Sequence, residues 1–218
     1  MDINMRGTLM SDDWAEVMRY FGFNDVFCPG DVRAAMESEE DITIYVNSDG
    51  GSLEAGTEIY SLIAEYGHSV TAHIQTRAAS AATVAVMSCH KIVCEPVSLV
   101  CIHNPSSWAE GDASVMRHTA DELDNIKKSI VAAYMGRTSK TEEEIAALMD
   151  KEMWIDAREA VENGLVDEIL PRKAGPHAIV NAVGAYHFPT EEMMEQFRNH
   201  KKNETEREAA TAFLEIYK

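Results

Sequence analysis

The sequence predicts an α/β protein in which strands alternate with helices, and three observations support that class. Residues 41–46 (DITIYV) are rich in β-branched side chains, and a glycine-containing turn and a helical apolar pattern up to Tyr66 follow them. The same order of strand, turn and helix returns over 70–87. Two short β-rich pieces, 91–94 and 98–102, come next. Such alternation is typical of an α/β architecture.

The N-terminal elements agree with this scheme. Residues 3–9 alternate weakly between apolar and polar side chains and predict a short strand. Ser11 is a suitable N-cap for a helix that reaches about Phe21, and Asp31 can cap a second helix over 32–37. The first helix would carry four apolar side chains on one face: Trp14, Val17, Met18 and Phe21.

The second half of the chain is more helical. Asp112 can cap a long helix that should end near Gly136, and residues 141–149 predict a shorter one with an acidic first turn. An extended piece follows, then a helix that stops at Gly164 and a short strand to Leu170.

The predicted organisation is one domain over residues 1–170 and an appendage over residues 171–218. Pro171 opens a linker rich in proline, glycine and basic residues. The segment from Thr190 to Lys218 is charged and helix-prone. It is expected either to dock on a neighbouring subunit or to be a flexible tail.

The composition excludes several classes of function. With 19 basic and 37 acidic residues the formal charge is −18, which argues against a nucleic-acid surface. No apolar run approaches the ~20 residues that span a membrane, and the N-terminus lacks a secretory signal pattern. We therefore expect a cytoplasmic protein with no membrane partner, in the host cytoplasm if a phage or prophage encodes it.

Cysteine and histidine spacing gives no sign of a metal site. The four cysteines form no C-x-x-C pair, and no H-x-x-x-H or H-E-x-x-H pattern occurs. We expect reduced cysteines that act as small buried apolar residues. The sequence also lacks nucleotide-binding glycine motifs. No metal and no cofactor are therefore expected.

Ser80 and His103 are the candidate catalytic pair. Ser80 should lie in the first turn of a helix that follows a strand, and His103 at the end of a later strand. A serine nucleophile needs a base, a group that orients the base, and donors for the oxyanion. The spacing of this pair is unspecific by itself, because a chain of this length contains many such pairs.

The remaining parts of a peptidase site have candidates too. Glycine exposes backbone N–H groups at sharp turns, so the N–H groups of Gly51 and Ser52 are the candidate oxyanion donors. An ordinary glycine turn or an anion-binding loop are the alternatives. Glu152 is the candidate orienting acid and Asp150 its alternative, although either could be a solvated charge.

Four segments resemble motifs of the ClpP serine peptidases in the same order. Tyr45–Ser52 resembles the family's Y-I-N-S-P-G-G pattern, and Ala78–Ala82 resembles its A-A-S-M-G pattern. Cys101–Pro105 resembles M-I-H-Q-P, and Trp154–Asp167 resembles E-A-V-x-x-G-L-V-D. Together they cover about Asp41 to Leu170, and as a set they are far more specific than any single motif.

Within that family the chain is most similar to the phage head maturation (prohead) proteases. The features that suggest this branch are the M-D-x-E-x-W segment at 149–154, the A-S-A-A segment at 79–82 and the H-N-P segment at 103–105. The resemblance implies a crotonase-like fold of repeated ββα units, with a protruding helical handle after Asp112. It also implies Ser80 as nucleophile, His103 as base, an acid at Glu152 and oxyanion donors at Gly51 and Ser52.

The resemblance further implies how the protein acts. It implies a serine endopeptidase that cleaves a capsid or scaffold precursor and assembles into a ring-shaped homo-oligomer. ClpP has an additional N-terminal segment that forms gating loops, whereas this chain enters its first strand at about Ile3. We therefore expect activity independent of ATP and of an unfoldase.

The chain departs from the ClpP pattern near the predicted site. Asp49 replaces a proline, Thr76 and Ala82 replace glycines, and Glu152 replaces an aspartate. Two other functions are kept as alternatives. One is a catalytically silent assembly partner, and the other is a crotonase-type acyl-CoA enzyme that would need neither Ser80 nor His103. A Ser–Lys peptidase with Lys91 as base has no further support.

Overall fold

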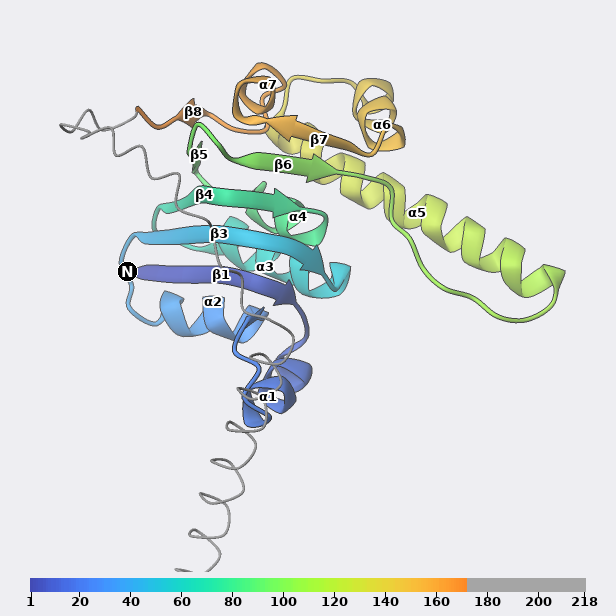
Figure 1. The fold of residues 1–218 in the computed structure, drawn as a ribbon, viewed down its shortest axis with the longest axis horizontal. Helices are drawn as coiled ribbons and strands as arrows, with labels where there is room; N and C mark the ends of the chain where they lie inside the picture. Colours follow the sequence, from blue (N-terminus) through green and yellow to red (C-terminus); the bar gives the residue numbers. More distant parts are fainter. Residues whose placement is uncertain (172–218) are drawn as a thin grey trace, which may run out of the picture. The chain divides into compact units, whose positions relative to one another are not determined.

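The structure, a computed structural model, describes residues 1–171 except for the side chain of Met153. Its central element in this part of the chain is an eight-stranded sheet with the order β2-β1-β3-β4-β5-β8, and neighbours along this path pair in parallel (Figure 1). The strands are β1 (Asp2–Leu9), β2 (Val26–Phe27), β3 (Ile42–Gly51), β4 (Val70–Ala79), β5 (Lys91–Cys94), β6 (Leu99–Ile102), β7 (Met153–Asp156) and β8 (Glu168–Ile169).

Helices connect most of these strands, as is usual for parallel pairing, whereas β5 leads to β6 without a helix. They are α1 (Asp12–Tyr20), α2 (Pro29–Met36), α3 (Leu53–Glu65), α4 (Ala81–Val86), α5 (Ala113–Arg137), α6 (Glu142–Asp150) and α7 (Ala157–Glu162). The alternation predicted from the sequence is therefore confirmed, and the fold is α/β with a mostly parallel sheet.

Strand β4 changes its partner along its length. Residues Thr71–Ile74 pair with β5, whereas Arg77–Ala79 pair with β6. β6 also pairs with β7, the antiparallel strand of the sheet. This exchange sets the end of β6 beside the end of β4, and the Ser80 N–H donates to the Cys101 carbonyl at 3.1 Å. The sheet topology thus brings Ser80 and the residues after Ile102 together.

The core lies between the sheet and the helices that cover it. Buried residues of β3 alternate with half-buried or exposed ones, and every residue of α4 is buried. Helices α3 and α4 approach closely because small residues face each other. A Cβ added at Gly56 would lie 2.7 Å from the Ala81 carbonyl oxygen. Close packing on both sides holds α4, and therefore the turn that precedes it, in place.

Helix α5 is the protruding handle expected from the sequence. Its 25 residues give a length of about 37 Å. Ile130, Val131 and Tyr134 are buried, whereas Val115 and Met116 near its start are exposed. In Figure 1 the first half of α5 extends beyond the sheet. No helix of residues 1–171 is long and apolar enough to cross a membrane.

Several local expectations need correction. Helix α1 ends at Tyr20 with Phe21 as its C-cap, and Trp14 and Phe21 are 65% and 68% exposed. Helix α2 begins at Pro29 with Cys28 as its N-cap, and Asp31 is instead the N3 residue whose carboxylate accepts from the Cys28 N–H at 3.0 Å. Strand β3 continues to Gly51, because the predicted turn after Val46 pairs with β1. The predicted appendage, 171–218, lies outside the described residues except for Pro171.

Candidate active site

Ser80 occupies a strained turn between β4 and α4. Its backbone has φ 57° and ψ −129°, a conformation that costs a non-glycine residue about 1–3 kcal/mol. Ser80 is the N-cap residue of α4, yet its side chain makes no capping hydrogen bond. A serine on a sharp turn from strand to helix, with a hydroxyl that the helix does not use, has the geometry of an exposed nucleophile.

His103 lies directly after β6, and its ring is held by the next residue. The ring atom Nδ1 lies 2.6 Å from the Asn104 carbonyl oxygen. A carbonyl only accepts hydrogen bonds, so Nδ1 must carry the proton. In the neutral ring, Nε2 is then unprotonated and free to accept a proton. This tautomer suits a general base.

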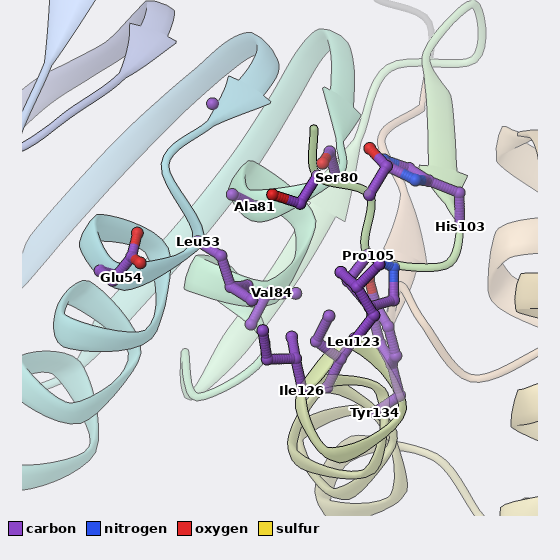
Figure 2. A pocket seen from close by; sticks show the side chains of 14 residues that line it. Leu53, Glu54, Ser80, Ala81, Val84, His103, Pro105, Leu123, Ile126 and Tyr134 are labelled. Carbon is purple, nitrogen blue, oxygen red and sulfur yellow. The ribbon is translucent and has the colours of Figure 1, made fainter. Parts of the chain in front are cut away.

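The two side chains line the same two cavities. One cavity of about 260 Å³ opens beside Ser80, Ala81 and His103, and Figure 2 shows its residues. Its far wall is mainly apolar and comes from α3, α4 and α5: Leu53, Val84, Leu123, Ile126, Ile130 and Tyr134. Such a wall can hold an apolar substrate side chain next to the nucleophile.

The second cavity, of about 400 Å³, is more polar. Ser80 and His103 line it together with Asp49, Lys151 and Glu152. Within residues 1–171 no hydrogen bond joins the Ser80 hydroxyl to the His103 ring, and none joins His103 to Glu152. Catalytic hydrogen bonds are often long without substrate and tighten in its complex.

The paired glycines lie against the nucleophile. A Cβ added at Gly50, where φ is +93°, would lie 2.7 Å from the Ser80 Cβ and 3.0 Å from the Ala81 nitrogen. Only glycine allows the end of β3 to approach this closely. Gly51 follows and lines the apolar cavity. Gly51 therefore lies at the same cavity as Ser80 and His103.

Ser52 does not fit the predicted oxyanion role. Its N–H donates to the Leu9 carbonyl at 2.9 Å, and its hydroxyl accepts from the Ala55 N–H at 3.2 Å as the N-cap of α3. Ser52 is thus engaged in joining β1 to α3. Sequence reasoning missed Ala81, which lines the cavity and begins α4, where N–H groups lack partners within the helix. Its position directly after the candidate nucleophile was the available signal.

The two candidate acids have different surroundings. Glu152, with φ 50°, lines the polar cavity, and after burial its charge is the next cause that raises the pKa of the Cys101 thiol. Asp150 instead accepts hydrogen bonds from Lys127 Nζ at 2.6 Å and from Asn104 Nδ2 at 2.9 Å. These bonds lower the pKa of Asp150. Glu152 therefore shares a cavity with His103, whereas Asp150 contacts Asn104, the residue that follows His103.

The cysteines of the described chain are free and buried, as the sequence predicted. Burial raises the pKa of Cys89 to about 12 and that of Cys94 to about 11, so both are protonated thiols near neutral pH. Residues 1–171 contain no cluster of three or more His, Cys, Asp or Glu side chains arranged to hold a metal ion.

Sequence comparison relates the chain to known proteins. The family model described as Clp protease matches residues 32–173. An ATP-dependent Clp protease proteolytic subunit of Bacteroides fragilis is 33% identical over 141 residues, which cover 64% of this chain and 68% of the relative. One from Porphyromonas gingivalis is 34% identical over 135 residues, with 61% of each chain covered. Proteolytic subunit 3 of Streptomyces avermitilis is 32% identical over 143 residues, with 65% of each covered. The chain therefore belongs to the Clp protease family, a family of serine peptidases.

Proposed function

We propose that the protein is a serine endopeptidase that cleaves peptide bonds by acyl transfer to Ser80. The observation that carries this proposal is the position of Ser80. It sits in a strained turn at the junction of two cavities that His103 also lines. Strained residues that project a reactive side chain into a cavity are typical of active sites.

The proposed mechanism has two balanced steps. The Ser80 hydroxyl attacks the substrate carbonyl as His103 Nε2 takes its proton, and the N–H groups of Gly51 and Ala81 are proposed to stabilise the oxyanion. The imidazolium then protonates the leaving amine. A water molecule attacks the acyl-enzyme, gives its proton to His103, and releases the acid while Ser80 regains its hydrogen.

A small movement of His103 toward Ser80 completes the catalytic contact in this proposal. The Asn104 carbonyl holds the proton on Nδ1, the role that a carboxylate has in a serine triad. Glu152, in the same cavity as the ring, is the proposed acid that stabilises the imidazolium. Asp150 is less suited to that contact, because Lys127 and Asn104 already occupy its carboxylate.

The proposed substrate is a capsid or scaffold precursor, cleaved during phage head maturation without ATP. The support is sequence similarity, through the M-D-x-E-x-W, A-S-A-A and H-N-P segments. We propose that residues 1–170 form the peptidase domain and that residues 171–218 form an appendage. A ring-shaped homo-oligomer that uses the α5 handle is part of the same proposal.

Co-expression with a capsid precursor tests this function. We expect cleavage with the wild-type chain and none with Ser80→Ala, whereas Ser61→Ala, at an exposed position of α3 that lines neither cavity, should leave cleavage unchanged. Unchanged processing by the Ser80 variant would refute the peptidase proposal.

One observation favours a second candidate, a catalytically silent assembly partner. No hydrogen bond joins Ser80 to His103 in the described residues. If this separation persists in the assembled protein, a fluorophosphonate probe will not react with Ser80 although the protein still assembles. Rapid labelling that depends on His103 excludes this candidate.

A further inference from the structure

We propose that Asn104, Asp150 and Lys127 form a positioning chain that holds His103 in register and ties the histidine to the handle helix α5. The inference rests on the proposed function, because it assigns residues that orient the proposed base. Asp150 thereby acts through Asn104 and not as the acid that contacts the imidazole.

Three consecutive contacts build this positioning chain. The His103 Nδ1–H donates to the Asn104 carbonyl at 2.6 Å, and Asn104 Nδ2 donates to Asp150 Oδ1 at 2.9 Å. The same Asp150 oxygen accepts from Lys127 Nζ at 2.6 Å. Asp150 ends α6 and Lys127 belongs to α5. Two helices therefore meet at Asp150, which binds the side chain of the residue that holds the histidine tautomer.

Asn104 is the central member of the positioning chain. Pro105 follows Asn104 and restricts the Asn104 backbone to extended conformations. The Asn104 carbonyl that holds His103 therefore has few alternative orientations. Its side-chain oxygen Oδ1 is buried and has no hydrogen-bond partner in the described part of the chain. An unsatisfied buried acceptor costs about 1–3 kcal/mol. Within the described residues the Asn104 side-chain amide is therefore held through its Nδ2 atom, which donates to Asp150, and not through Oδ1.

The outer contact is suited to a geometric role. The Lys127 and Asp150 side chains are 25% and 59% exposed, so water and salt screen their attraction. The pair is a weak source of stability, yet it fixes the Asp150 oxygen that holds Asn104. Misplacement of a catalytic group by about 1 Å can cost about a hundredfold in rate. A weak surface pair can thus matter for catalysis through position.

Through Lys127, the positioning chain connects the handle helix α5 to His103. Lys127 lies between the exposed start of α5 and its buried end at Ile130–Tyr134. A shift of α5 relative to α6 changes the Lys127–Asp150 contact and, through Asn104, the orientation of His103. Events at the exposed half of the handle can therefore reach the proposed base through three side chains.

Labelling of Ser80 by a fluorophosphonate probe measures this positioning. In the full-length protein we expect Asp150→Ala and Asn104→Ala to label about tenfold more slowly, and the double variant no more slowly than either, because both break one path. Asp150→Asn keeps an acceptor for Asn104 and should stay within about threefold of wild type. Wild-type rates in both alanine variants, or losses that multiply in the double variant, would overturn the proposal.

Lysine substitutions provide a matched pair. Lys127→Met removes the contact to Asp150, whereas Lys128→Met removes an equal charge from a lysine that bonds only Asn125 in the described residues. We expect a loss of about threefold or more for Lys127→Met and wild-type labelling for Lys128→Met. Equal rates for the two variants contradict the role of Lys127.

A second measurement does not depend on catalysis. Nitrogen-15 NMR of histidine-labelled protein, assigned by loss of the His103 signal in His103→Asn, reports which ring nitrogen carries the proton. We expect the Nδ1–H tautomer in wild type and Asp150→Asn, and a tautomer mixture in Asp150→Ala. If Ser80 of the wild-type protein does not react with the fluorophosphonate but the His103 tautomer shifts in Asp150→Ala as expected, the proposed function fails and the positioning chain stands. If wild type labels and the tautomer does not change in Asp150→Ala, the positioning chain alone fails.

Discussion

Gly50→Ala should disable the nucleophile while leaving the fold intact. The new Cβ would lie 2.7 Å from the Ala79 carbonyl oxygen and from the Ser80 Cβ, where ordinary contact begins at 3.4 Å. The backbone of Ser80 must therefore move by about 0.7 Å, and displacement on this scale costs about 30- to 100-fold in rate. The positive φ adds about 1–3 kcal/mol of backbone strain.

Substitutions at two other glycines separate the steric displacement of Ser80 from the backbone strain. Gly22 also has a positive φ, of +82°, but an added Cβ meets nothing within 4 Å, and Gly67 has open space without the φ constraint. In urea unfolding, Gly22→Ala should lose about 1–2 kcal/mol of stability and Gly67→Ala almost none. Both should label with a fluorophosphonate at wild-type rates. If Gly50→Ala labels as fast as Gly22→Ala, the close approach of β3 to Ser80 is not needed for reactivity.

Three further predictions concern specificity, capping and thiols. Peptides with leucine or methionine before the scissile bond should be cleaved about tenfold or more faster than those with aspartate, and Ile126→Asp should remove this preference in kcat/KM. Hydrogen bonds from Ser114 and Val115 lower the pKa of Asp112, so its cap adds stability above about pH 4 that is lost as the pH falls further. Urea unfolding of Asp112→Ala should thus show lower stability at pH 7 and convergence with wild type at acid pH; a constant difference would contradict this. Cys89 and Cys94 should resist iodoacetamide at pH 8 until urea exposes them, and mass spectrometry that finds either modified in the folded protein would refute their burial.

The order of elements was predictable because hydrophobic periodicity and turn residues are local signals. Residues 42–46 and 53–65 formed the expected strand and helix. The strand boundary was wrong where pairing with a distant segment determines the local structure. Asn47–Gly51 has the composition of a turn, yet it extends β3 because β1 offers a pairing edge. Periodicity placed Trp14 on an apolar face of α1 but does not report whether the rest of the chain covers that face, and Trp14 is exposed.

The candidate site was predictable to the extent that it resides in motifs. Ser80 and His103 lie in recognisable segments, and the structure sets them around shared cavities. The use of the Ser52 N–H was not predictable, because its acceptor, Leu9, lies more than forty positions earlier in the chain. The Lys127–Asp150–Asn104 contacts span 23 and 46 positions and required coordinates.

The most direct test of the central claim is peptide mapping by mass spectrometry after reaction with a fluorophosphonate. We expect one adduct, on Ser80, that forms rapidly in the wild-type protein, is absent from Ser80→Ala and is strongly slowed in His103→Asn. An adduct on another serine, or labelling of Ser80 at an unchanged rate in His103→Asn, would contradict it.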